Sequence, residues 1–487
     1  MEIGILAYGA YIPRRRLARK SVADANAWFN PALRGQAKAE RSMCNWDEDA
    51  VTMAVEAARD CLTGFDRDQV RSVQLASTSF PFEDRLNSGI VAQALNLGAE
   101  ISSLDVGSSQ RAATAGLAAV LEGAAGAGGP ALFLASEKRR TKVGSTLEMT
   151  SGDGAAALLV GSGKVIAKFI GSNSRTVDFI DHYRGQGVAY DYVWEERWIR
   201  DEGYNKIVPA TLAGLFKKTA IEPGSIAHFC MPCTLGKVAA SVAKKAGIPE
   251  GAVRDNLHAV CGETGTAHSL VMLADALAAA KPGERILVVG FGQGCDALLF
   301  EATADLQRLP PRMGVRGYLA RRREETNYNR FLAFNELVTL ERGMRAELDK
   351  QTALSTLYRN RGMILSLVGG RCSKCGTAQF PKSNVCVNPD CNAFHTQVDH
   401  AFAETGGKVN SHTADQLTYS PDPPAICGMV QFDGGGRLMA DFTDMDMAEL
   451  SVGLRMRMVF RIKDYDSQRG FTRYFWKATP AGAAKEA

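Results

Sequence analysis

The first part of the chain alternates apolar runs with helical segments. From Met1 to about Thr303, short β-branched runs alternate with segments rich in Ala and Gly. Strands buried on both faces are apolar throughout, so these runs predict a layered α/β domain. The elements expected in its first half are the strand 73–79, the helix 90–97, the strand 103–106, the helix 113–123, the strand 131–135 and the run 154–161.

The same order of elements recurs further along. We expect the strand 226–230, the helix 238–246, the segment 255–260, the helix 266–280, the strand 285–289 and the run 295–301. Matching pieces lie about 150 residues apart, which is too long for a solenoid and predicts two similar halves that face each other. A pocket is expected between the halves, where strand ends meet helix N-termini that favour an anionic ligand.

The pattern changes twice beyond residue 303. Residues 306–361 are rich in Arg, Glu and Leu and predict a helical extension with a break at Pro310. From Arg371, cysteines and turn residues precede strand-like runs, and this order indicates a ribbon followed by a barrel. The last residues, 481–487, are expected to fray. The domains expected are a first half at 1–165, a second half with the extension at 166–345, a helix and ribbon at 346–400, and a barrel at 401–487.

Composition narrows the classes of protein. The 487 residues exceed what one hydrophobic core usually organises, and 46% hydrophobic residues with a net charge of +4 are typical of a globular enzyme. Acidic positions among the barrel strands, such as Asp441, argue against nucleic-acid binding. The N-terminus lacks a basic-then-apolar signal and no apolar stretch is long enough for a bilayer, so we expect a cytoplasmic protein without a membrane partner.

Four of the eleven cysteines lie close together near the C-terminus. Cys372 and Cys375 form one short pair, and Cys386 and Cys391 form a second, which suits tetrahedral zinc. Four protein ligands leave no open position on the metal, so we expect a structural zinc. A metal-free ribbon is the alternative, because the second pair has four intervening residues where two are usual.

Three motifs carry a family resemblance. They are Leu104-Asp105-Val106-Gly107, the segment from Arg111 to Gly116 and the segment from Lys281 to Val289. With the duplicated halves, they resemble hydroxymethylglutaryl-CoA synthases of the archaeal and bacterial type over roughly residues 1 to 345. The tail from about residue 350 resembles zinc-ribbon and OB-fold proteins that accompany thiolases as separate subunits. The resemblance implies a duplicated thiolase-like α/β/α/β/α domain, followed by a rubredoxin-like zinc ribbon and a small OB-fold β-barrel.

The resemblance also implies where the catalytic residues lie. Such synthases use a cysteine at the N-terminus of a buried helix, and Gln110 stands at that place. Cys230 stands where the family has its histidine, and Glu263 where it has an asparagine. Thr78 stands at the strand end that carries the acidic residue. Because an amide cannot act as the nucleophile, we expect chemistry on acyl-CoA without an acyl-cysteine.

Three functional interpretations remain. The first is carbon–carbon bond formation or cleavage, of aldol type or by decarboxylation, with Glu263 as acid/base, Cys230 or His228 assisting, and Gln110 lining an oxyanion site. The second is a catalytically degenerate scaffold or CoA-binding subunit that assembles with a true thiolase through its tail. The third is a thiolate relocated to Cys230, Cys233 or Cys261, although each also suits a buried structural cysteine.

A coenzyme A thioester, as substrate or ligand, has candidate contacts in two segments. Lys138 and Arg139 begin a basic run that could meet the CoA phosphates, and Gly292 and Gly294 could present backbone donors to a thioester oxygen. A solvated loop and an ordinary glycine turn are the alternatives. The resemblance also implies a homodimer formed by extension of the central sheets and a complex with a thiolase.

Overall fold

The computed structural model describes residues 2–126, 128–349 and 351–481, which form two compact units. The first unit comprises Met1–Cys44, Asp49–Gly89 and Leu97–Leu337. The second comprises Asn45–Glu48, Ile90–Asn96 and Val338–Ala487. The expectation that residues 481–487 fray lies, apart from Ala481, outside the described residues. No helix among the described residues combines the length and the apolar character needed to cross a membrane.

A nine-stranded mixed sheet runs through the first unit in the order β11-β12-β13-β8-β1-β7-β6-β4-β5. On both sides of the β1–β8 pair, two antiparallel pairings are followed by a parallel one. The predicted duplication is therefore present in the strand order. The bounds are β1 Ile3–Tyr11, β4 Ser72–Ala76, β5 Ser102–Val106, β6 Ala131–Glu137, β7 Gly154–Ser162, β8 Ala167–Thr176, β11 Ile226–Cys230, β12 Arg285–Phe291 and β13 Gly294–Ala302.

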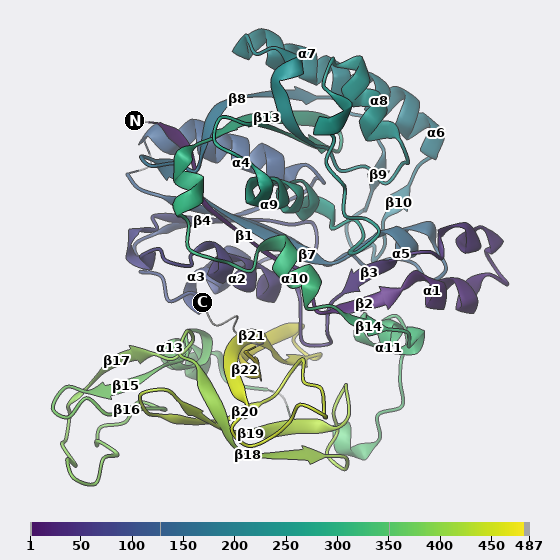
Figure 1. Cartoon of the computed structure of the whole chain (residues 1–487). Coiled ribbons are helices and arrows are strands. Elements are labelled where there is room, and N and C mark those ends of the chain that lie inside the picture. Colours follow the sequence, from purple (N-terminus) through teal and green to yellow (C-terminus); the bar gives the residue numbers. More distant parts are fainter. Residues whose placement is uncertain (1, 127, 350, 482–487) are drawn as a thin grey trace. The chain divides into compact units, whose positions relative to one another are not determined.

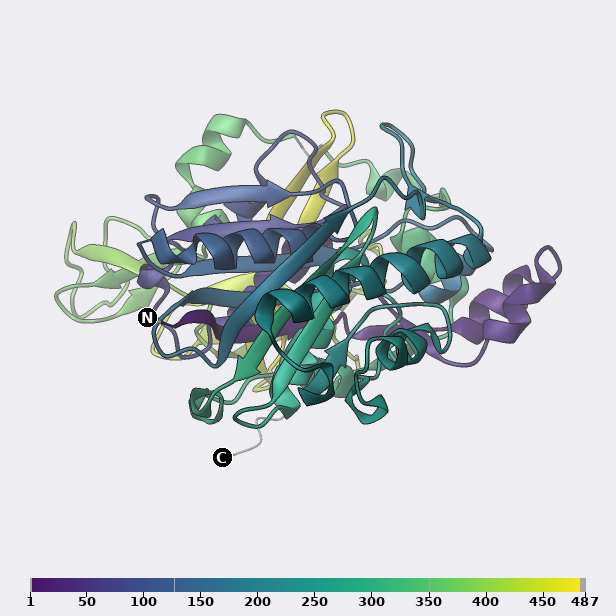
Figure 2. The same ribbon diagram turned by 90° about the horizontal axis from the view of Figure 1, so that it is seen from above.

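Helices separate and cover the two halves of this sheet. Helix α2 (Ala50–Cys61) packs on β1 and β7, and α7 (Val208–Thr219) packs on β8 and β13. Helices α4 (Ala112–Gly123) and α9 (His268–Ala279) touch each other and contact strands of both halves. Figure 1 shows the resulting order of layers, from α7 through the strands and the central helices to α2. In Figure 2, seen from above, the teal helices lie over the strands.

One sequence expectation differs from the structure in detail. The expected segment 255–260 runs through Leu257, which has a φ of 59° and donates its N–H to the Asp255 carboxylate at 2.9 Å, into a turn at 258–260. The predicted helical extension is broken into short pieces. They are α10 Gly314–Ala320, β14 Arg323–Glu325, α11 Tyr328–Phe334, α12 Leu354–Arg359 and α13 Arg361–Leu365.

The second unit contains two small sheets. A three-stranded sheet in the order β16-β15-β17 precedes a five-stranded one in the order β20-β19-β18-β21-β22. A bridge between Phe442 and Ala478 joins the two ends of the larger sheet, as in a barrel, around Phe432, Phe460 and Trp476. The bounds are β15 Val368–Cys372, β16 Ala378–Gln379, β17 Gln397–Ala401, β18 Gly407–Asp415, β19 Ala425–Phe432, β20 Arg437–Asp441, β21 Arg455–Asp466 and β22 Phe471–Pro480.

Charged side chains of the barrel strands β21 and β22 are buried in ion pairs. The Arg461 guanidinium lies 3.0 Å from the Glu48 carboxylate and 3.2 Å from that of Asp444. The Lys477 ammonium lies 2.9 Å from Asp47, and burial lowers the pKa of Lys477 while the Asp47 charge opposes that change. An unpaired buried charge is strongly destabilising. Removal of Glu48, Asp444 or Asp47 would therefore leave Arg461 or Lys477 short of a partner and destabilise the fold.

We predict that Gly290→Ala destabilises the first unit. A Cβ at Gly290 would lie 2.0 Å from the Thr114 hydroxyl, whose oxygen donates a hydrogen bond to Asp296 at 2.9 Å. Overpacking of this kind costs about 1–3 kcal/mol, so the midpoint of thermal unfolding should fall by several degrees in calorimetry. Gly224→Ala is the control, since nothing lies within 4 Å of its Cβ position. Equal midpoints for the two variants would contradict this packing.

Candidate functional site

A cavity of about 600 Å³ lies in the first unit, lined by residues from both halves. Gln110 lies two residues before α4, and Arg139 follows β6. Pro232 follows β11, and Glu263 lies in the loop before α9. The cavity therefore forms where strand ends meet helix N-termini, as expected for a ligand site in a duplicated α/β unit.

Gln110 is held at the N-terminal end of the twelve-residue helix α4. Ser108, two residues earlier, adopts a φ of 72°, and the Ser109 hydroxyl donates to the Gly292 carbonyl at 3.1 Å. A Cβ at Gly292 would lie 3.0 Å from that of Gln110, so a glycine allows this close approach. Gln110 thus lines the cavity just before the positive end of a helix, a suitable place for a residue that stabilises an oxyanion.

Arg139 is the buried cation of the cavity. Its Nε donates to Asp191 at 2.9 Å, and its Nη1 lies 3.6 Å from the Glu263 carboxylate. Burial alone would lower the pKa of Arg139, but the charges of Asp191, Glu263 and Glu137 outweigh it and raise that pKa. The guanidinium is therefore a permanent charge that fixes two carboxylates, and it faces these groups within the cavity wall.

A second carboxylate network adjoins Arg139. Both the backbone N–H and the hydroxyl of Thr78 donate to the fully buried Glu137, at 3.1 and 2.9 Å. Arg184 donates to the Thr78 carbonyl and lies 3.3 Å from Asp191. The structure thus puts the hydroxyl of Thr78 on a carboxylate, Glu137, that the sequence did not single out.

Two further cavity residues, Asp181 and His182, were missed by the sequence reasoning. His182 begins the short strand β9 (His182–Tyr183), and its Nδ1 lies 2.7 Å from the Asp181 carboxylate. Both side chains line the cavity and are mostly buried. The sequence signal is only an Asp-His pair in an aromatic segment between the two halves, which by itself does not identify a site.

The candidate thiols are buried and protonated at neutral pH. Burial raises the pKa of Cys230 and of Cys261 to about 12, and that of Cys233 to about 11. Cys233 lines the cavity, whereas Cys230 is not among the lining residues and directs its thiol to the Met272 carbonyl at 3.6 Å. Because only the thiolate is a good nucleophile, these surroundings disfavour a relocated acyl-cysteine.

Four other sequence candidates also lie outside the lining of the cavity. The Nε2 atom of His228 lies 2.9 Å from the Glu284 carboxylate. The Lys138 N–H donates to the Ser79 hydroxyl at 2.9 Å. Gly294 lies in β13, where a Cβ would come within 2.2 Å of the Arg175 carbonyl oxygen. Gly292 packs against Gln110, which does line the cavity.

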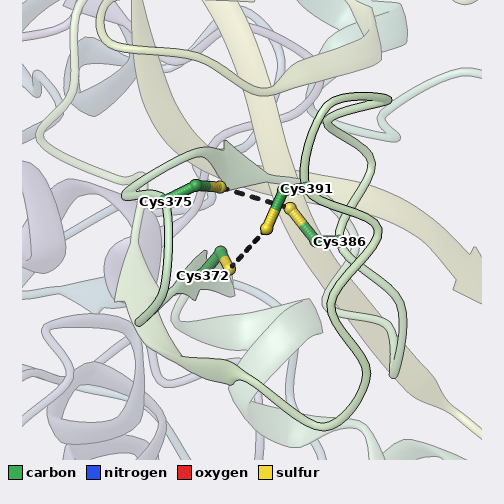
Figure 3. Close-up of side chains that lie close together, drawn as sticks. All are labelled: Cys372, Cys375, Cys386 and Cys391. Atoms are coloured by element: carbon green, nitrogen blue, oxygen red, sulfur yellow. Dashed lines mark hydrogen bonds between the residues drawn. The ribbon is translucent and has the colours of Figure 1, made fainter.

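The four clustered cysteines converge in the second unit. The sulfur atoms of Cys372, Cys375, Cys386 and Cys391 all lie within 4.8 Å of one another, and Figure 3 shows the side chains pointing inward. Cys372 and Cys391 are 3.9 Å apart, and Cys375 and Cys386 are 3.5 Å apart. Tetrahedral zinc with bonds of about 2.3 Å separates its sulfurs by about 3.8 Å, so the set fits this ion. A bond with the Thr377 hydroxyl lowers the pKa of Cys375 to about 6, which favours a thiolate ligand.

We predict one zinc ion per chain, measured by elemental mass spectrometry on the purified protein. Cys375→Ser should lose the metal, because three thiolates bind zinc less tightly than four. Cys427→Ser is the matched control, since Cys427 lies in β19 outside the cluster. Acidification should release the ion as the thiolates gain protons. A folded wild-type protein that contains no zinc would contradict the assignment.

Three parts of the chain match described families. Residues 216–300 match the C-terminal part of 3-oxoacyl-[acyl-carrier-protein] synthase III. Residues 360–394 match the rubredoxin-like zinc ribbon domain of ChsH2, and residues 403–461 match its C-terminal OB-fold domain. The predicted zinc ribbon and OB-fold domain are thereby confirmed.

Whole proteins and solved structures resemble the first part of the chain. A hydroxymethylglutaryl-CoA synthase of Aeropyrum pernix is 30% identical over 332 residues, covering 67% of this chain and 92% of that protein. One of Methanosarcina acetivorans is 32% identical over 315 residues, covering 62% and 88%. A structure of an HMG-CoA synthase complexed with CoA has a TM-score of 0.60 and 19% identity, covering 82% of this chain and 100% of that one. These likenesses confirm the predicted thiolase-like fold, and the chain belongs to the hydroxymethylglutaryl-CoA synthase family.

Proposed function

We propose that the first unit binds an acyl-CoA thioester in its cavity and forms or cleaves a carbon–carbon bond without an acyl-cysteine. The observation that carries this proposal is Gln110, which lines the cavity at the N-terminus of α4. In the synthases that the chain resembles, the corresponding place holds the nucleophilic cysteine. Solved relatives are complexes with CoA and with 3-hydroxy-3-methylglutaryl coenzyme A, which supports a CoA thioester as the ligand.

In this proposal Gln110 stabilises charge and a carboxylate moves protons. The Gln110 amide and the end of α4 hold the negative charge that develops on the thioester oxygen. Glu263 lines the same cavity and exchanges protons with the substrate, while Arg139 keeps its carboxylate in position. Lys142, which also lines the cavity, adds positive charge beside an anionic ligand. Aldol-type, Claisen-type and decarboxylating reactions all pass through an enolate of this kind.

A catalytically silent subunit is the second candidate function. It is favoured by the buried thiols, since Cys230, Cys233 and Cys261 all have raised pKa values and the position of the acyl-cysteine holds Gln110. In this version the chain binds CoA and assembles with a thiolase through its zinc ribbon and OB-fold domain.

A homodimer fits both versions, because β5 ends the nine-stranded sheet and Leu104 on it is 53% exposed. We place the protein in the cytoplasm, where cysteines stay reduced and able to bind zinc.

We predict that Glu263→Gln lowers turnover at least 100-fold, the scale expected for loss of a general acid/base. The protein, alone and with a partner thiolase, is incubated with β-ketoacyl-, malonyl- and β-hydroxyacyl-CoAs, and products are followed by mass spectrometry. Glu284→Gln is the matched control, because its carboxylate lies outside the cavity lining. Turnover that requires the thiolase and is unaffected by Glu263→Gln would support the silent subunit and refute the enzyme.

Binding of CoA is predicted to protect a cysteine introduced at Gln110. In Gln110→Cys the new thiol lies at a helix N-terminus in the cavity, so it should react with iodoacetamide faster than the buried native thiols. Peptide mass spectrometry locates the label. Desulfo-CoA, which lacks the thiol that would itself consume iodoacetamide, should slow labelling at this position and leave the exposed Cys375 unaffected once zinc is removed. Labelling that desulfo-CoA does not change would argue against CoA in this cavity.

A further inference from the structure

The Asp181–His182 pair is built into the wall of the cavity by its own hairpin. Strand β9 pairs with β10 (Tyr192–Val193), and His182 lies opposite Val193. The N–H of Trp194 donates to the Asp181 carbonyl at 3.0 Å. Val193 and Trp194 line the cavity as well, so the backbone of the hairpin fixes both members of the pair against it.

The hydrogen bond within the pair sets the tautomer of His182. A carboxylate can only accept, so the 2.7 Å contact requires the proton on Nδ1 of the neutral ring. That tautomer leaves Nε2 with a free lone pair, and the Nδ1 contact is the ring's one hydrogen bond among the described residues. Asp181 keeps a buried oxygen, Oδ1, without a hydrogen-bond partner in the described part of the chain. A basic nitrogen backed by a carboxylate thus borders the cavity, the arrangement that makes a histidine a good proton acceptor.

The surroundings of His182 connect it to Gln110. Gln293 donates its side-chain amide to the His182 carbonyl at 3.5 Å. Gln293 directly follows Gly292, the residue that packs against the Cβ of Gln110. Glu263, the other candidate for proton transfer in the cavity, is tied to the Arg139 cation at 3.6 Å. His182 instead contacts a carboxylate, that of Asp181.

We propose that His182, backed by Asp181, is the base that removes the α-proton of an acyl-CoA thioester. The inference rests on the proposed function: it assigns removal of the α-proton to His182 and leaves the later proton transfers of bond formation or cleavage to Glu263. The α-carbon–hydrogen bond breaks, the proton moves to Nε2, and the electron pair moves onto the thioester oxygen as an enolate. The Asp181 carboxylate stabilises the imidazolium that forms, and Gln110 with the end of α4 stabilises the enolate. Return of the proton regenerates the thioester, so this step needs no other reactant.

Hydrogen–deuterium exchange tests this step without knowledge of the second substrate. The full-length protein is incubated in D2O with acetyl-CoA and, separately, with octanoyl-CoA, and deuterium at the α-carbon is measured by mass spectrometry. Wild type should exchange, and His182→Gln should exchange at least 100-fold more slowly, as expected for loss of a general base. Added imidazole should restore exchange in His182→Ala. Exposed His412 in the second unit supplies the control, His412→Gln, which should exchange like wild type.

Asp181 is a positioning residue, and its variants separate that role from a merely structural one. Asp181→Asn should slow exchange about 10- to 100-fold while the dissociation constant for CoA, measured by calorimetry, stays unchanged. Asp181→Glu should recover part of the rate, since it restores a carboxylate. Loss of CoA binding together with exchange in Asp181→Asn would show a structural role and overturn the assignment of Asp181.

The outcomes distinguish this inference from the proposed function. Failure of the wild-type protein to bind CoA would refute the proposed function. CoA binding without exchange from either thioester, or exchange that His182→Gln leaves intact, would overturn the inference alone. Exchange abolished by Glu263→Gln or His228→Gln, with His182→Gln still active, would assign the base elsewhere and also overturn it.

Discussion

The candidate site depends on one buried cation. Arg139 follows β6 and holds Asp191, from the segment after the β9 strand, and Glu263, from the loop before α9. A guanidinium without partners would not be stable in this buried position, and Glu263 would lose this ion pair without it. The mutual requirement fixes three segments that are far apart in the sequence around one cavity. Its geometry is therefore set by charge balance as much as by packing.

The two candidate groups for proton transfer have different partners. The Glu263 carboxylate lies 3.6 Å from Arg139, whereas Nδ1 of His182 lies 2.7 Å from the Asp181 carboxylate. Two titratable groups in different surroundings can divide acid and base roles within one site. With Gln110 at the end of α4, the cavity offers donors for an oxyanion and acceptors for a proton. Chemistry through an enolate requires both kinds of group.

The zinc ribbon and the OB-fold domain are stabilised by different interactions. Four cysteine thiolates around one ion stabilise a small sheet that has little hydrophobic core of its own. The barrel instead buries aromatic side chains such as Phe460 and Trp476. The four cysteines of the ribbon would leave no open position on a tetrahedral ion. Their contribution is accordingly proposed to be assembly.

The sequence by itself determined the fold and the metal ligands. Apolar runs and short cysteine spacings are local signals, so the repeated strand order and the four thiol ligands could be predicted. It also singled out Gln110 and Glu263 through their neighbouring motifs. Only the tertiary structure decided that Arg139 faces carboxylates, that Cys230 lies outside the cavity lining, and that the Asp181–His182 pair borders it. Those facts depend on contacts between distant segments, for which the order of residues along the chain carries no local pattern.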